Sequence, residues 1–446
     1  MRNFLLAFVH CLFFSQLLSQ ESYTLSPQGS SSETPAVSVF PDGRFAVVWK
    51  QDTGLVLRLL SPDGLPESGT FVIRANNSAR NPDVVVGSDN NIRIVWKEGS
   101  NTFFSIVSEQ AEVLFVSFVP SQASFAPRIS LGPNNLSHIV VERQEFVQTR
   151  LSLLSYSADG SVFTNTRLTS RITNENRIEP DIVTDHAGVS AIVCHLSVQT
   201  SFYDFFLILV DQDSSISPRR LFSVNIRDSN PLIAINPDNP ETIFLYQISV
   251  NDGQSTLCGL SPGPESRIIP SSTGVRSARA AVGSDGVCRI IWNTNDGRTF
   301  LATQMPALTN WVISTPRLLS DSANGSPDIA VNQNGVQAIF SVDGQITAQH
   351  FPESSFQLPH FIRGDSNGDT FVDISDCIHI LLGLFESVPL PCMSASDANA
   401  NHSLELSDAV FILNHVFGGG PSPDGPFPNC GSSSNSVLGC GQKSCP

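Results

Sequence analysis

The chain has 446 residues, of which 41 are Asp or Glu and 25 are Lys or Arg, giving a formal net charge of −16. A surface with this excess of negative charge repels the phosphates of nucleic acids and the head groups of anionic lipids. We therefore expect neither nucleic acid nor an anionic membrane surface as a partner.

Residues 1–20 have the layout of a secretory signal peptide. Arg2 precedes an apolar run from Phe4 to Phe14, and a segment containing Ser and Gln continues to Gln20. The run is too short for a membrane span, and no later stretch reaches the ~18 apolar residues that a spanning helix needs. We expect a secreted protein, extracellular or at the cell surface. Eight cysteines then remain, an even number that suits disulfides, although eight allow 105 pairings.

A repeat of strand, tight turn and strand runs through residues 22–357. Three tryptophans each lie fourteen residues after the first residue of their copy, which makes the period structural: Trp49, Trp96 and Trp292. Successive copies begin 45 to 53 residues apart, near Pro35, Pro82, Pro127, Pro180, Pro231, Ala278 and Pro327. Alternating runs and Asp-Gly turns give each copy about four strands.

Units of ~40 to 50 residues with four short strands are typical of propeller blades. We predict a mainly β chain, with a seven-bladed β-propeller of four-stranded blades followed by a small α-helical module. Tandem β-sandwiches are the competing architecture, but each would need roughly 100 residues, twice the observed unit.

No catalytic residue is predicted in the propeller. Cys194 occupies the place that tryptophan holds in three copies, which favours a buried core residue over a nucleophile. The sequence has no G-x-S-x-G elbow, no phosphate-binding glycine loop and no Cys-x-x-Cys pair.

Two similar acidic loops lie near the C-terminus, at residues 365–376 and 397–408, and each runs into an apolar helical pattern, at 377–385 and 409–417. Oxygen atoms at loop positions 1, 3, 5, 9 and 12, with the carbonyl at position 7, can surround one hard cation, and Ca²⁺ is the expected ion. Ordinary turns and helix caps are the alternative reading, because Asp, Asn and Ser also form these.

The two loop-helix units resemble those of type I dockerin modules, in which Asp closes the loop. The resemblance implies calcium ligands in the first loop from Asp365, Asn367, Asp369, the Phe371 carbonyl, Asp373 and Asp376. In the second loop it implies Asp397, Asn399, Asn401, the Ser403 carbonyl, Glu405 and Asp408. Both loops lack the usual glycine at position 6, where Thr370 and His402 stand. The first loop has four carboxylates and the second three, so the first should bind calcium more tightly.

The resemblance also implies a partner. In dockerins the start of the helix contacts a cohesin, which here corresponds to Ser375 and Ser407, with Ile374 and Leu406 beside them. Alternatively, Ile374 and Leu406 fill the core of the module and the serines cap its helices. The expected boundaries are a linker at 358–363, the module at 364–418, and a tail rich in Pro, Gly and Cys at 419–446.

Two function classes remain open. In the first, the protein is a non-catalytic binding or scaffold protein that docks to a cohesin-like protein or a cell-surface scaffold in the presence of calcium. Polysaccharide is a further candidate partner, and polysaccharide breakdown is the expected process. In the second, the propeller is a carbohydrate-active enzyme, a glycosidase or a lyase. A propeller glycosidase needs a pair of carboxylates at one mouth of its channel, and no pair can be assigned from the sequence. The first class is therefore preferred.

Overall fold

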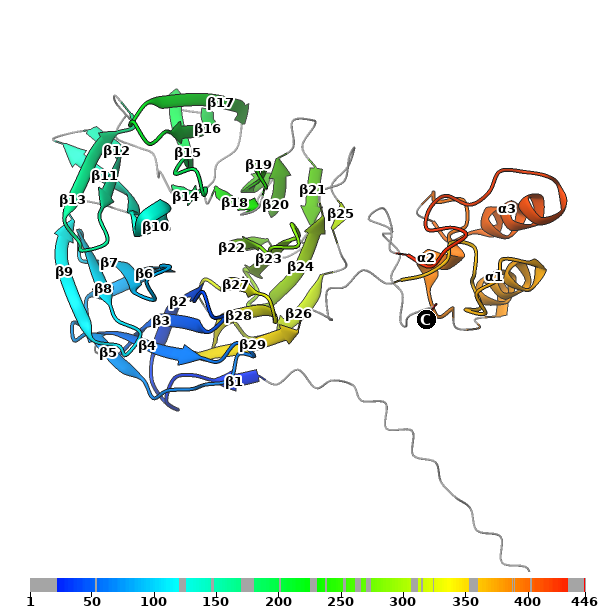
Figure 1. Cartoon of the computed structure of the whole chain (residues 1–446), viewed down its shortest axis with the longest axis horizontal. Coiled ribbons are helices and arrows are strands. Elements are labelled where there is room, and N and C mark those ends of the chain that lie inside the picture. Colours follow the sequence, from blue (N-terminus) through cyan, green and yellow to red (C-terminus); the bar gives the residue numbers. More distant parts are fainter. Residues whose placement is uncertain are drawn as a thin grey trace, which may run out of the picture.

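The computed structural model describes a region of β-sheets and a C-terminal module (Figure 1). The described residues are 22–52, 54–119, 126–145, 148–169, 180–199, 202–224, 231–236, 239–251, 254–260, 266–269, 274–305, 312–313, 316–323, 325–352, 360–386, 388, 390–401, 403–431 and 445. The expected signal segment, residues 1–20, lies outside them. Among the helices in these ranges, none has the length and apolar character needed to cross a membrane.

The strands form antiparallel sheets that follow one another along the chain. The first sheet comprises β2 (Ser32–Val39), β3 (Phe45–Gln51), β4 (Gly54–Leu60) and β5 (Phe71–Arg74). The second comprises β6 (Ala79–Val86), β7 (Ile92–Glu98), β8 (Asn101–Val107) and β9 (Val113–Val119). The third comprises β10 (Arg128–Leu131), β11 (Ser137–Glu145), β12 (Gln148–Tyr156) and β13 (Val162–Arg167). The fourth comprises β14 (Asp181–Thr184), β15 (Ser190–Gln199), β16 (Phe202–Val210) and β17 (Ile216–Val224).

Three more sheets complete the set. The fifth comprises β18 (Leu232–Asn236), β19 (Asn239–Asn251), β20 (Gln254–Leu260) and β21 (Ser266–Ile269). The sixth comprises β22 (Val275–Val282), β23 (Cys288–Thr294), β24 (Thr299–Met305), β25 (Val312–Ile313) and β26 (Arg317–Ser320). Both β25 and β26 pair with β24, so this sheet has an outer strand in two pieces. The seventh comprises β27 (Asp328–Asn332), β28 (Gly335–Val342), β29 (Gln345–Pro352) and the N-terminal β1 (Ser22–Thr24).

The second strand of the first sheet, β3, is buried on both faces. Ala46 and Val48 pack in one cluster with Ile94 and Trp96 of the next sheet. The alternate residues of β3 pack in another cluster with the seventh sheet. This double burial explains why β3 reads as a continuous apolar run rather than as an alternation of apolar and polar residues.

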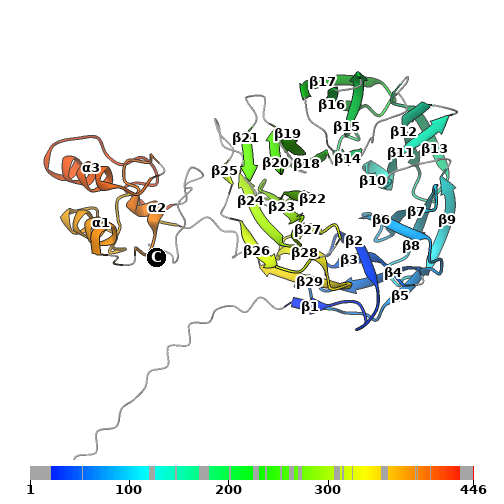
Figure 2. The same cartoon turned by 180° about the vertical axis from the view of Figure 1, so that it is seen from behind.

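The sheets stand in a closed ring (Figures 1 and 2). Each first strand contacts the first strands of the two neighbouring sheets, in the order β2, β6, β10, β14, β18, β22, β27 and back to β2. The N-terminal β1 pairs antiparallel with β29, the last strand of the region, with Ser22 opposite Gln349. The two ends of the region are therefore joined within one sheet, which leaves no open gap between the first and seventh sheets.

The mainly β, propeller-type fold is confirmed, and tandem sandwiches are not formed. The described residues make seven sheets, which is the number of sequence repeats, and every repeat begins at or beside the first strand of a sheet. Trp49, Trp96 and Trp292 are fully buried on the second strands. Cys194 is fully buried at the corresponding place on β15, as expected for a core residue.

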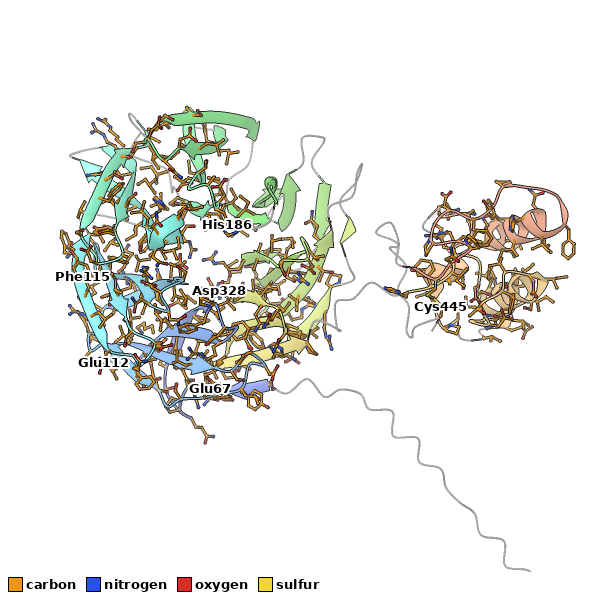
Figure 3. All side chains as sticks on the ribbon, in the orientation of Figure 1. Glu67, Glu112, Phe115, His186, Asp328 and Cys445 are labelled. Atoms are coloured by element: carbon orange, nitrogen blue, oxygen red, sulfur yellow. A yellow bond between two sulfur atoms is a disulfide. The ribbon has the colours of Figure 1, made fainter. Side chains whose placement is uncertain are left out.

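A polar cavity of about 240 Å³ lies among the first strands. Asp83, Arg128, Arg279 and Asp328 are among its lining residues, and Figure 3 shows Asp328 toward the middle of the ring. Asp328 accepts a hydrogen bond of 2.8 Å from the amide of Val37, which belongs to the next sheet around the ring.

Two more aspartates repeat this link between sheets. Asp83 accepts from the amide of Ile129 at 2.9 Å, and Asp181 accepts from the amide of Ile233 at 3.1 Å. These acids therefore join the second sheet to the third, the fourth to the fifth and, through Asp328, the seventh to the first.

Charge in this cavity is only partly balanced. Arg128 Nε lies 3.8 Å from Asp181, and Arg279 Nε lies 4.0 Å from Asp328. Burial, together with the negative charge of Asp83, raises the pKa of Asp181 and of Asp328 to about 7. Near neutral pH, ionisation of these groups therefore opposes folding.

Asp328→Asn should reveal this opposition, because the amide keeps an oxygen for the Val37 amide but cannot ionise. In the folded protein Asp328 holds its proton up to pH about 7, whereas in the unfolded chain it releases the proton near pH 4. The contribution of Asp328 to the free energy of unfolding is therefore fully present below pH 4, and it is lost as the pH rises to 7. Near pH 4 the variant and the wild type should have similar free energies of unfolding. At pH 8 the free energy of unfolding of the variant should be higher, by on the order of a few kcal/mol. A difference that does not change with pH would contradict the raised pKa.

Candidate functional site

The C-terminal module contains three described α-helices, α1 (Ile374–Glu386), α2 (Met393–Ser396) and α3 (Leu406–Phe417). The two predicted helical patterns are confirmed, although each helix begins three residues early, inside the acidic loop. Both helices contribute to one buried core, formed by Cys377, Ile380, Ala398, Ala409 and Ile412. Residues 32 apart in the sequence occupy matching places, so the module is an internal duplication in structure as well as in sequence.

In the first loop, the carboxylates at positions 1 and 12 are fully buried and held by backbone amides. Asp365 accepts from the amides of Gly368, Asp369 and Thr370 at 2.8 to 3.1 Å. Asp376 accepts from Ser366 at 2.7 Å, from Asn367 at 3.2 Å and from Asp373 at 2.9 Å. These bonds fold the loop around its two buried acids.

The intervening side chains coil the same loop through short-range bonds. Asn367 accepts from the amide of Asp369, and Asp369 accepts from the amide of Phe371, both at 2.9 Å. Asp373 accepts from the amide and hydroxyl of Ser375. Thr370, at the position where glycine is usual, has φ +76, the left-handed conformation that glycine adopts most easily.

The second loop repeats this arrangement with fewer charges. Asp397 and Asp408 are buried, and Asp397 accepts from the amide of Asn401 at 3.1 Å. Asp408 accepts from the amides of Asn399 at 3.3 Å and Glu405 at 2.9 Å, and it forms a capping box with Glu405 at the start of α3. Ser403, between Asp397 and Asp408 in the sequence, is exposed. His402 lies outside the described residues.

The electrostatics of the first loop disfavour charge on its two buried acids, Asp365 and Asp376. Burial raises the pKa of Asp365, with the negative charge of Asp369 adding to the effect. Burial, with the charge of Asp365, raises the pKa of Asp376 to about 6. Among the described residues, no Lys, Arg or His forms an ion pair with Asp365, Asp369, Asp373 or Asp376. The loop therefore concentrates negative charge without a cationic side chain to balance it.

No three His, Cys, Asp or Glu side chains within the described ranges converge as a compact metal-binding cluster. The first loop brings its position 1 and position 12 acids into the interior, while Asp369 and Asp373 remain exposed. The amide Asn367 and the carbonyl of Phe371 complete the set of oxygens in the twelve-residue loop. The residue types suit a hard cation that prefers carboxylate, amide and carbonyl oxygens.

The second loop has a cation of its own, which sequence analysis missed. Arg363 is buried, and its Nη1 donates to the Asp397 carbonyl at 2.7 Å and lies 3.6 Å from the Asp397 carboxylate. Nη1 also donates to the Ser394 carbonyl, and Nε of the same side chain donates to the Gly425 carbonyl, each at 3.4 Å. Arg363 thus connects the entry of the module to α2, the second loop and the tail.

The module extends beyond the boundaries expected from the sequence. Phe361, placed in the linker by the sequence analysis, is fully buried with Cys392 and Ala395. Its backbone exchanges two hydrogen bonds with Gly431, of 2.9 and 3.1 Å. Cys430 and Cys445 form a disulfide, and Figure 3 shows Cys445 beside the module. Residues 361–363 and part of the expected tail therefore belong to the folded module.

Both long helices carry an exposed apolar stripe. On α1 it comprises Ile374, Ile378 and Phe385, and on α3 it comprises the matching Leu406, Val410 and Phe417. Ile374 is 48% exposed and Leu406 is 53% exposed, so the alternative that these residues fill the core is wrong.

The serines beside these stripes are engaged in the loops. Ser375 donates to Asp373 and accepts from Asn367. Ser407 donates to Glu405 and accepts from Asn399. Two similar faces, each beginning at an acidic loop, are therefore open to solvent.

Comparison with known proteins gives the fold and no family. No protein-family model and no curated protein matches the sequence. Among solved structures, a lectin from Burkholderia pseudomallei matches with a TM-score of 0.50 and 11% identity, over 74% of this chain and 99% of the lectin. Virginiamycin B lyase from Staphylococcus aureus matches with a TM-score of 0.47 and 12% identity, over 74% of this chain and 99% of the lyase. The polysaccharide lyase Uly1 matches with a TM-score of 0.48 and 8% identity, over 71% and 89%. The likeness supports a propeller-type fold alone.

Arg363→Met should loosen the module, because methionine keeps the apolar stem but leaves three carbonyls and the Asp397 carboxylate without their donor. The expected loss is about 2 to 5 kcal/mol, measured by amide hydrogen exchange of α1 and α3 in chelator. Arg298→Met is the control, because Arg298 is 39% exposed in a surface ion pair with Asp296, and such pairs contribute about 0 to 1 kcal/mol. Equal exchange in both variants would show that Arg363 is not needed.

Proposed function

We propose that the protein is a secreted, non-catalytic binding protein whose C-terminal module is dockerin-like, folds around calcium and docks to a cohesin-like partner. The observation that carries the proposal is the pair of duplicated loops, each with buried carboxylates at positions 1 and 12 and each leading into an exposed apolar stripe. The Cys430–Cys445 disulfide supports an oxidising compartment outside the cell.

Calcium would be held in the first loop by Asp365, Asn367, Asp369, the Phe371 carbonyl, Asp373 and Asp376. Burial and mutual repulsion disfavour negative charge on the buried carboxylates of this loop. A bound divalent cation would offset that charge. In the second loop the candidates are Asp397, Asn399, Asn401, the Ser403 carbonyl, Glu405 and Asp408. Arg363 already places positive charge 3.6 Å from the Asp397 carboxylate, so attraction for a cation is weaker there.

The central cavity favours binding over glycoside hydrolysis. Asp83, Asp181 and Asp328 each accept a backbone amide of the next sheet, which assigns them a structural task. A glycosidase needs two carboxylates free to act on one glycosidic bond. Release of reducing sugars from a panel of polysaccharides by the purified protein would favour the enzymatic alternative.

The first loop should dominate calcium binding. Asp376→Asn should lower affinity at the tighter site by more than tenfold, about 1.4 kcal/mol, whereas Asp408→Asn should leave that site nearly unchanged. Calorimetric calcium titration of the full chain after chelator treatment measures both. In the wild type, calcium should also raise the melting temperature of the module, because ligand binding to the folded state stabilises it. Identical titration curves for the two variants would contradict the ranking, and no calcium binding at all would contradict the calcium assignment.

Docking should require calcium and tolerate the loss of one apolar face. We expect the full chain to capture a partner from the extracellular fraction of the source organism in calcium but not in chelator. Ile378→Glu or Val410→Glu alone should retain capture through the other face, while the double variant should lose it. Leu65→Glu is the control, because Leu65 is 44% exposed on the propeller. Capture that survives chelator or the double variant would contradict docking through these faces.

A further inference from the structure

A second cavity, of about 200 Å³, lies between the third and fourth sheets. It forms where β11 begins and β12 ends on one side, and where β15 begins and β16 ends on the other. His138 and Ser155, which are direct cross-strand neighbours, line one wall. Ser190 and Gln212 line the wall from the fourth sheet, and Phe163 of β13 lies at the outer side.

At this cavity the third sheet has a histidine where two other sheets have an arginine. In the second and sixth sheets the equivalent positions of the second strand are Arg93 and Arg289, as the strand registers show. Both arginines are fully buried and bind the acid of the adjacent turn, Asp89 and Asp285, through two nitrogens. In the third sheet this position is His138, and the adjacent turn, Pro133–Asn135, has no acid. His138 therefore has neither the long side chain nor the acid partner of these two arginines.

His138 itself has an unused polar atom. The residue is 7% exposed, and its Nδ1 lies 2.9 Å from the Ser155 hydroxyl. Its Nε2 has no hydrogen-bond partner among the described residues. A buried polar atom without a partner is unfavourable, and such atoms in folded proteins are often completed by water or a ligand. Burial lowers the pKa of His138 to about 4, so at neutral pH the ring is uncharged and Nε2 can accept or donate according to the tautomer.

The remaining lining defines the chemistry of an occupant. Hydroxyl and amide groups of Ser155, Thr164, Ser190 and Gln212 line the cavity together with the carboxylate of Asp211 and several apolar side chains, and no Lys or Arg lines it. Gln212 is fixed by donating to the Ala187 carbonyl. Phe163 is 63% exposed and offers an apolar ring at the side of the cavity. An anion would find no cationic partner, and a wholly apolar molecule would leave the polar groups unpaired.

We infer that this cavity binds one neutral sugar ring of a glycan, with His138 Nε2 and the surrounding hydroxyl and amide groups contacting its hydroxyls and Phe163 contacting its apolar face. The volume is below the roughly 300 Å³ at which pockets for drug-sized ligands begin, which suits a single ring. The inference rests on the proposed binding role of the propeller and is independent of the calcium loops.

The test uses the full chain with neutral methyl glycosides of glucose, galactose, mannose, xylose and fucose, observed by saturation-transfer NMR and titrated by calorimetry. At least one glycoside should bind the wild type. His138→Arg, which restores the side chain of the second and sixth sheets, should abolish binding by filling the cavity. Phe163→Ala should weaken it at least tenfold, and because Phe163 is mostly exposed this variant should fold normally. Phe118→Ala is the matched control, since Phe118 is 49% exposed on the outer strand of the second sheet and does not line the cavity.

Two outcomes would overturn the inference: no glycoside of the panel binds at millimolar concentration, or binding persists unchanged in both His138→Arg and Phe163→Ala. Running every titration in chelator separates this result from the proposed docking. Loss of calcium-dependent capture with retained glycoside binding would reject the docking function alone. Retained capture without glycoside binding would reject the sugar site alone.

Discussion

No sheet of the propeller can bury its own apolar residues, and this constraint governs the rest of the region. Second strands such as β3, β11 and β15 bury apolar residues on both faces, so they need a neighbouring sheet on either side. A row of sheets would leave its two end members exposed, whereas a ring leaves none. The pairing of β1 with β29 and the hydrogen bonds from Asp83, Asp181 and Asp328 to neighbouring sheets both serve this closure. The two cavities described here lie among the first strands at the centre of the ring and beside His138, between the third and fourth sheets.

Buried and half-buried aspartates are used in two different ways in this chain. In the central cavity, each aspartate has a backbone amide, and Asp181 and Asp328 have a nearby arginine as well. In the first acidic loop, Asp365 and Asp376 have several amides but no cationic side chain paired with them among the described residues. The second loop lies between these cases because of Arg363. The balance of local charge, rather than the number of acids alone, therefore distinguishes a structural aspartate from a candidate ligand.

Features that recur in the sequence were predictable, and features made by a single residue were not. The strand repeat, the buried tryptophans and the two loop-helix units follow from spacing, because equal environments at equal intervals select similar residues. The burial of Arg363 depends on carbonyls contributed 31, 34 and 62 residues further along the chain, and nothing adjacent to it signals those contacts. The cavity beside His138 was equally hidden, since it requires the strand register that aligns His138 with Arg93 and Arg289. The exposed faces of α1 and α3 could have been read from the pattern, but two apolar stripes on one short helix are compatible with either a larger core or an open surface.

The position of β1 has a consequence for how the propeller forms. This strand is synthesised before the seven repeats, and β29, its only pairing partner among the described strands, is synthesised after most of them. Until β29 is made, the last sheet cannot exist and the first sheet lacks a neighbour on one side. The contact spans nearly the whole region, and such distant contacts slow folding because a long loop must close first. An unfinished ring exposes strand edges and apolar faces that invite association with other chains. Before the ring closes, these edges and faces are therefore open to association, and β1 can complete the seventh sheet only after β29 has been made.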